Sequence, residues 1–178
     1  MRPFKFRASS LGRIMTDAQA IDPALLTEDL AVISRKTKKS DEEKAMLAPL
    51  KEQSLSAGAK TYLDTLAKEF VYSYERTISS KYLEKGLMVE NDSIELYNSV
   101  FFTSLEKNTE RRDNEWITGE CDIAAPRKII DIKSAWSLDT FPATALQAHD
   151  ADYEWQGRAY MWLWEKPEFE VAWCLVDT

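Results

Sequence analysis

The sequence predicts a mixed α/β (α+β) fold, in which a mixed β-sheet with a central antiparallel hairpin is flanked by helices. Helical patterns occupy most of the first hundred residues, strand patterns follow to about residue 135, and one helix and one strand come after them. A strand that returns after a helix indicates a mixed sheet covered by helices.

The expected elements follow from local patterns along the chain. Ser9 or Ser10 is the expected N-cap of the first helix, and Asp22-Pro23 opens the second. The third helix carries apolar and aromatic side chains at four-residue steps, whereas RKTKKSDEEK, residues 35–44, is expected to be a polar loop. The expected helices span residues 9–15, 23–33, 58–74, 80–100 and 153–165, and the expected strands span residues 102–107, 115–124, 129–135 and 169–176.

Length and composition indicate a single domain over residues 1–178. The chain is 44% apolar and contains six tryptophans, which is enough for a sizeable core. It has no apolar run of about 18 residues and no signal-peptide core, so we expect a soluble protein of the cytoplasm. The chain ends just after a strong strand pattern, which leaves open whether C-terminal elements are missing.

The cysteine count and the net charge exclude some kinds of functional site. Cys121 and Cys174 are too few for a four-cysteine zinc or iron–sulfur site, and we expect reduced, partly buried thiols. The lone His149 is expected on the surface. A net charge of −7 is unusual for a protein whose whole surface binds nucleic acid, but it allows a local basic groove. Basic side chains cluster at residues 2–7, 35–39, 111–112 and 127–128.

The segment ITGECDIAAPRKIIDIKSAW, residues 117–136, is typical of a β-hairpin. In its second half Asp131 and Lys133 share one face of a strand, because side chains alternate at a period of two. Pro126 cannot adopt the positive φ of a two-residue hairpin turn, so we expect a four-residue loop around a type I turn. Either loop length pairs Ala124 with Ile129.

That register places Asp122 opposite Asp131 and Glu120 opposite Lys133. Like charges about 5 Å apart repel by on the order of 3 kcal/mol at an effective dielectric near 20. A cation between the carboxylates would remove this repulsion. The alternative is a solvated edge hairpin with a Glu120–Lys133 ion pair, and the hairpin alone does not decide between the two.

Two further segments carry polar residues among apolar neighbours. Glu90 lies in the apolar setting of KGLMVENDSIELY and is either a surface residue or a ligand that reaches the sheet. In YEWQGRAYMWLW, Gln156 and Tyr160 lie on one helix face. The aromatic residues there are expected in the core, but a buried Gln156 amide needs hydrogen-bond partners.

Four segments, in this order, resemble the phage lambda exonuclease-like group (YqaJ-type or alkaline exonucleases) of the PD-(D/E)xK nuclease superfamily. They are FRASSL, KGLMVENDSIELY, GECDIAAPRKIIDIKSAW and YEWQGRAYMWLW, which together span residues 6 to 164. The resemblance implies a restriction-endonuclease-like core. This chain departs from the group in its shorter length, which leaves the C-terminal part of the fold in doubt.

The resemblance also implies a metal site. Asp122, Asp131 and the carbonyl of Ile132 would hold Mg²⁺, for which Mn²⁺ can substitute, and Glu90 would hold a second ion or the attacking water. Oxygen ligands of this kind suit hard divalent cations.

Other roles follow from the same resemblance. Lys133 would act on the water and the transition state, Gln156 would orient these groups, and Ser9 would anchor a phosphate. Arg7, close to Ser9 in sequence, offers a further cation to that phosphate. A plain helix cap is the alternative role for Ser9.

The implied activity is metal-dependent hydrolysis of linear double-stranded DNA from its ends, 5′ to 3′, in phage-type recombination. The implied partners are DNA ends, a ring-shaped homotrimer and a single-strand-annealing recombinase, in a bacterial or phage-infected cell. One alternative is a RecB-like or other nuclease of the superfamily, in DNA repair or defence. Another is a non-catalytic DNA-end-binding module of the same fold.

Overall fold

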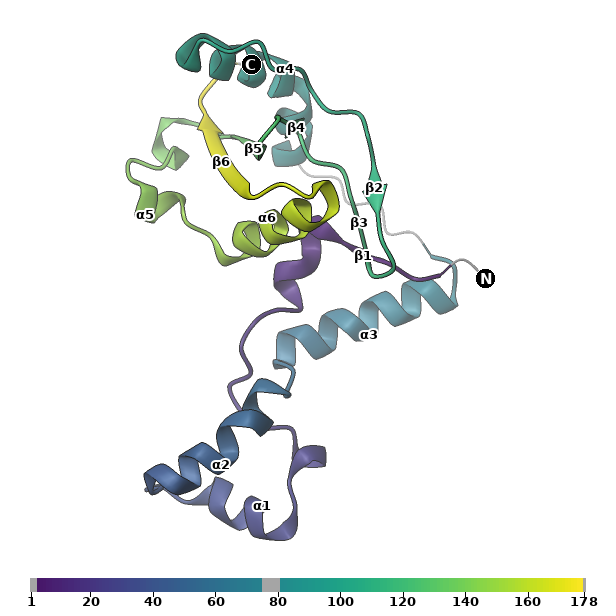
Figure 1. The fold of residues 1–178 in the computed structure, drawn as a ribbon, viewed down its shortest axis with the longest axis vertical. Coiled ribbons are helices and arrows are strands. Elements are labelled where there is room, and N and C mark those ends of the chain that lie inside the picture. The colour runs from purple at the N-terminus through teal and green to yellow at the C-terminus, as the bar shows by residue number, and fades with distance from the viewer. Residues whose placement is uncertain (1–2, 75–80, 178) are drawn as a thin grey trace. The chain divides into compact units, whose positions relative to one another are not determined.

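The structure, a computed structural model, describes residues 3–74 and 81–177, and the chain forms two compact units (Figure 1). The larger unit contains residues 1–12 and 75–178, and the smaller contains residues 13–74. All candidate site residues belong to the larger unit. Arg2 and Ser80, which the sequence places in a basic cluster and in a helix, lie outside the described residues.

The smaller unit is helical. It contains a 3₁₀ turn at Pro23–Leu25 and helices α1 (Glu28–Arg35), α2 (Asp41–Glu52) and α3 (Ala57–Val71). The prediction of a loop over residues 35–44 is wrong at Arg35, which ends α1, and from residue 41 onward. A capping box starts α2 there, since Ser40 and Glu43 each accept a hydrogen bond from the other's backbone N–H.

Two helices of the larger unit, α4 (Lys81–Phe101) and α6 (Ala151–Trp164), agree with the helices expected over residues 80–100 and 153–165. The unit also contains η1 (Ala8–Arg13, which reaches the unit boundary), η3 (Leu138–Thr140) and α5 (Ala145–Ala148). The first helix is shorter and tighter than expected, because η1 is a 3₁₀ helix. Ser9 and Ser10 lie inside η1 and not before it, so the prediction that one of them is its N-cap is wrong.

Within the described residues, six strands form two three-stranded sheets, which confirms the mixed α/β class. The first sheet has the order β1 (Phe6–Arg7), β3 (Ile117–Gly119) and β2 (Arg112–Asp113). The second has the order β4 (Ile123–Ala124), β5 (Lys128–Ser134) and β6 (Glu168–Cys174), with β4 antiparallel and β6 parallel to β5. Residues 102–107, expected to be a strand, form no regular structure after α4 ends, and β2 was not expected.

The expected strand over residues 115–124 is divided between the two sheets. It breaks at residues 120–122, where backbone carbonyls bond to groups outside any strand ladder. Tyr160 donates its hydroxyl hydrogen to the carbonyl of Glu120, and Asn108 donates to the carbonyls of Cys121 and Asp122. These bonds turn the chain from the first sheet into the second.

The predicted hairpin register is confirmed. Ala124 pairs with Ile129 and Ile123 pairs with Ile130, which leaves four residues between the paired strand ends. The ladder stops at Ile123, so Asp122 lies just beyond it and its side chain is free to turn toward β5.

Strand β5 separates two hydrophobic clusters, as its two-residue alternation predicts. Ile129 packs with residues of α6, and Ile130 and Ile132 pack with residues of α4. Both cysteines are free and fully buried, and burial raises the pKa of Cys121 to about 12. No helix among the described residues is long and apolar enough to cross a membrane.

Candidate active site

Asp131 is the most enclosed of the candidate site residues. It lies on β5, on the face turned toward α6, and its side chain is only 2% exposed. Gln156 Nε2 donates a hydrogen bond of 3.0 Å to Asp131 Oδ1, and Lys133 Nζ lies 2.6 Å from Asp131 Oδ2. Lys133 is therefore ion-paired with this buried oxygen, and a metal ion that used Asp131 Oδ2 would have to share it with the ammonium or displace the ammonium.

Gln156 is held in place by Tyr160, one turn later on α6. Its Nε2 lies 3.2 Å from the Tyr160 hydroxyl, which donates at 2.9 Å to the carbonyl of Glu120. Gly119 lets Tyr160 approach this closely, because a Cβ there would lie 2.8 Å from the Tyr160 ring and 2.9 Å from the Cβ of Ala8. The buried amide of Gln156 thus has the partners that the sequence required.

Asp122 lies beside Asp131, as the hairpin register predicts. Burial, followed by the negative charge of Asp131, raises the pKa of Asp122 to about 6, although the backbone N–H of Ile132 donates a 2.6 Å hydrogen bond to Asp122 Oδ2. Burial also raises the pKa of Asp131, against the opposing effect of Lys133. Without a further cation, the positive charge and hydrogen bonds around the two carboxylates therefore do not offset the cost of burying their negative charges.

Lys133 keeps its proton in this setting. Burial by itself lowers the pKa of Lys133, but the carboxylates of Asp131 and Asp122 outweigh that effect and raise it. The ammonium also lies over the ring of Tyr153, with Nζ 4.7 Å from the ring centroid. Lys133 is therefore a fixed positive charge and not a neutral base.

Glu90 reaches the same site from α4. Its negative charge contributes, as the smallest of the effects, to the raised pKa of Asp122, so the two carboxylates lie near enough to interact electrostatically. Glu90 Oε2 forms an ion pair of 2.6 Å with Lys107 Nζ, a residue that sequence reasoning missed. Lys107 follows no motif, and it reaches the site because Asn108 anchors the segment after α4 to residues 121 and 122.

Glu120 does not pair with Lys133. It forms an ion pair of 3.0 Å with Arg111, and Lys133 pairs with Asp131 instead. The alternative of a solvated hairpin with a Glu120–Lys133 pair is therefore wrong in its central contact, because the chain leaves the strand at Glu120.

Ser9 and Arg7 lie near the first sheet and not in the acidic cluster. Arg7 pairs with Thr118 across β1 and β3, and both Arg7 and Ser9 are exposed. Ala8, between them, is buried close to Gly119, in the strand that leads to Glu120. Among the described residues no hydrogen bond or ion pair joins Ser9 or Arg7 to Asp122 or Asp131.

The oxygen donors at this site are of the kind that binds a hard divalent cation, but Lys107 and Lys133 pair with two of the carboxylates. Asp122, Asp131, Glu90 and the Ile132 carbonyl carry oxygen donors, and the Lys133 ammonium lies 2.6 Å from Asp131 Oδ2. Within residues 3–74 and 81–177, no group of three or more His, Cys, Asp and Glu side chains is arranged to hold a metal ion. Glu90 is instead paired with Lys107, so a cation that used Glu90 would have to displace that ammonium.

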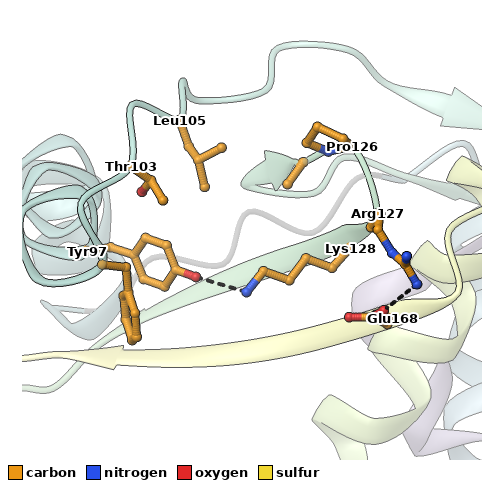
Figure 2. A pocket seen from close by; sticks show the side chains of 9 residues that line it. Tyr97, Thr103, Leu105, Pro126, Arg127, Lys128 and Glu168 are labelled. Atoms are coloured by element: carbon orange, nitrogen blue, oxygen red, sulfur yellow. Dashed lines mark hydrogen bonds and ion pairs between the residues drawn. The ribbon is translucent and has the colours of Figure 1, made fainter.

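A separate pocket of about 410 Å³ lies at the start of β5, on the face turned toward α4 (Figure 2). Figure 2 shows Lys128 pointing to Tyr97 and Arg127 pointing to Glu168 at its margin. None of the candidate site residues lines this pocket, so the acidic cluster and the pocket are different places on the sheet.

Comparison with known proteins identifies a similar solved structure. No family model and no curated protein matches the chain. The crystal structure of a phage-related exonuclease from Haemophilus somnus 129PT matches with a TM-score of 0.73 and 31% sequence identity, over 99% of this chain and 70% of that chain. The matched region includes the segments that carry the acidic site, and at this identity and coverage the chain belongs to the family of this phage-related exonuclease.

Proposed function

We propose that the protein is a Mg²⁺-dependent deoxyribonuclease that hydrolyses phosphodiester bonds at the ends of linear double-stranded DNA. We assign it to the lambda exonuclease-like group of the PD-(D/E)xK superfamily. The observation that carries the proposal is the arrangement around Asp131, where Gln156, Lys133 and Asp122 meet at the positions that the sequence resemblance names. The similarity to a phage-related exonuclease supports it independently.

Mg²⁺ or Mn²⁺, held by Asp122, Asp131, the Ile132 carbonyl and Glu90, would neutralise charge on the scissile phosphate and lower the pKa of an attacking water. Such a cation would also relieve the mutual repulsion of Asp122 and Asp131, which the raised pKa of Asp122 reports.

The side chains of the chain itself supply positioning and fixed charge. Lys133, which stays protonated, donates hydrogen bonds to the water or to a phosphate oxygen as negative charge develops there. Gln156 fixes the orientation of Asp131, and Tyr160 fixes Gln156 through a chain of hydrogen bonds to the Glu120 carbonyl. The cluster is therefore organised before the substrate arrives, which reduces the reorganisation needed in the transition state.

A DNA end would be held outside the acidic cluster. Ser9 and Arg7 are exposed beside the strand that enters the site, and a hydroxyl with a guanidinium can bind a terminal 5′-phosphate. With the end held there, digestion would proceed 5′ to 3′. Processive digestion would require the chain to enclose its DNA, for which a ring of three copies is our proposal, with a single-strand-annealing recombinase receiving the product strand.

Digestion of linear duplex DNA tests the proposed function. Duplexes labelled at either the 5′ or the 3′ ends are incubated with protein in Mg²⁺ or in EDTA. We expect 5′-labelled mononucleotides to be released in Mg²⁺ and not in EDTA. A covalently closed circular duplex should stay intact. Failure to cut any DNA with Mg²⁺ or Mn²⁺ would contradict the proposal and favour an end-binding module.

A further inference from the structure

Lys107 lies on the acidic site although no motif points to it. Its ammonium lies 2.6 Å from Glu90 Oε2, and the Glu90 side chain is only 16% exposed whereas that of Lys107 is 41% exposed. The ammonium of Lys107 therefore occupies an oxygen of Glu90, one of the carboxylates proposed to hold an ion.

The position of Lys107 is fixed by its neighbour Asn108. The Asn108 backbone N–H donates a 2.7 Å hydrogen bond to the carbonyl of Asp122, and its side-chain amide donates to the carbonyls of Cys121 and Glu110. Because these hydrogen bonds fix the backbone of Asn108 against residues 121 and 122, less conformational entropy is lost when the neighbouring Lys107 pairs with Glu90. The pairing with Glu90 is therefore a built feature of the site.

We propose that Lys107 competes with a divalent cation for the carboxylate of Glu90, and so sets how tightly the site binds the ion that Glu90 helps to hold. This inference rests on the proposed function. A carboxylate oxygen paired with an ammonium has to lose that pair before it can ligate a metal. The free energy of the Lys107–Glu90 pair is therefore subtracted from the free energy of metal binding at Glu90.

The same pairing has a consequence for the other two acids. Asp122 accepts from the Ile132 backbone and Asp131 pairs with Lys133, so neither depends on Lys107 for its position. An ion bound by Asp122 and Asp131 alone should respond little to the loss of Lys107. The affinity for the ion that uses Glu90 should change strongly when Lys107 is lost. Lys107 is therefore a positioning residue that affects one ion and not the other.

Isothermal titration of the full chain with Mn²⁺ tests the proposal. The Glu90-dependent ion is defined as the Mn²⁺ whose binding Glu90→Gln weakens. Lys107→Met removes the ammonium and keeps an apolar stem, and it should tighten that binding about fivefold, equivalent to ~1 kcal/mol at 1.4 kcal/mol per factor of ten. Lys107→Gln, with a shorter neutral side chain, should give the same direction.

Lys128→Met is the matched control. Lys128 also pairs with a glutamate, Glu170, and its loss changes the net charge equally, but it lines the pocket at the start of β5, which includes neither Glu90 nor Lys107 (Figure 2). This variant should leave Mn²⁺ affinity unchanged within about twofold. The effect of Lys107→Met should also vanish in a Glu90→Gln background, because the competed carboxylate is then absent.

The outcomes separate this inference from the proposed function. Absence of any Mn²⁺ binding by the wild type would overturn the metal site and the inference with it. Mn²⁺ binding that Glu90→Gln does not weaken, or that Lys107→Met does not tighten, would overturn the inference alone. An equal tightening in the Glu90→Gln background would do the same, since it would reveal a general field effect and not competition for Glu90.

Discussion

Replacing Asp122 by asparagine should stabilise the metal-free protein at neutral pH, because the native structure disfavours the charged form of this residue. Burial and the neighbouring Asp131 raise the pKa of Asp122 from its ordinary value near 4 to about 6. That difference corresponds to about 3 kcal/mol at 1.36 kcal/mol per factor of ten. Asparagine retains an oxygen that can accept the hydrogen bond from the Ile132 backbone.

The sign of the pH dependence follows from linkage. The folded protein binds the Asp122 proton more tightly than the unfolded chain does, so protonation favours folding. Below about pH 4 both states are protonated and the destabilisation is absent. It grows as pH rises from about 4 to about 6 and is complete above about pH 6. The stability difference between Asp122→Asn and the wild type should therefore grow over this window.

Denaturant unfolding in EDTA at several pH values between 4 and 8 measures this difference. The variant should be nearly as stable as the wild type at pH 4 and up to about 3 kcal/mol more stable at pH 8. Asp92→Asn, on an exposed position of α4, serves as the control and should show no such growth. An Asp122→Asn protein that is less stable than the wild type at pH 8 would refute the electrostatic argument.

Three further predictions concern metal, the buried amide and the DNA end. Mg²⁺ or Mn²⁺ should raise the melting temperature of the wild type in calorimetry and not that of Asp122→Asn, because preferential binding stabilises the folded state; equal effects on both proteins would place the ion elsewhere. Gln156→Ala should lower the rate of DNA digestion about tenfold to a hundredfold, since Asp131 then loses its orienting hydrogen bond; an unchanged rate would remove Gln156 from the site. Ser9→Ala combined with Arg7→Ala should abolish faster cutting of 5′-phosphorylated over 5′-hydroxyl ends, while metal stabilisation persists; a wild type that cuts both ends equally would exclude this anchor.

The hairpin could be predicted from sequence because its determinants are local. Alternation in residues 129–135 sets the two faces of β5, and either loop length that the turn allows pairs Ala124 with Ile129. Once that register is known, Asp122 and Asp131 must lie close together. The electrostatic conflict between them was therefore visible before the structure.

Elements that depend on distant partners could not be predicted in this way. The break at residues 120–122 depends on Tyr160 and Asn108, which contact the chain from outside the hairpin. Local alternation through residues 115–124 instead indicated one continuous strand. Lys107 was missed for the same reason, since only the tertiary fold brings it to Glu90 on another element.

Helix α2 illustrates a different limit. Residues 41–52 are strongly charged and carry Pro49, so they resemble a loop by composition. The capping box of Ser40 and Glu43 and the acidic first turn start a helix nevertheless, because these residues satisfy free backbone N–H groups and interact favourably with the helix dipole. The Ser-x-x-Glu pattern was present in the sequence and could have revealed this element.

The central claim, that the cluster around Asp131 hydrolyses DNA, is tested most directly by single-turnover digestion of linear duplex with Lys133→Ala. The Lys133 ammonium stabilises the negative charge that develops in the transition state more than it stabilises the bound substrate. Its loss should therefore lower the rate of DNA digestion by about a hundredfold or more. DNA binding by this variant, measured at fixed salt, should stay within about tenfold of the wild type. Wild-type digestion by Lys133→Ala would contradict the account.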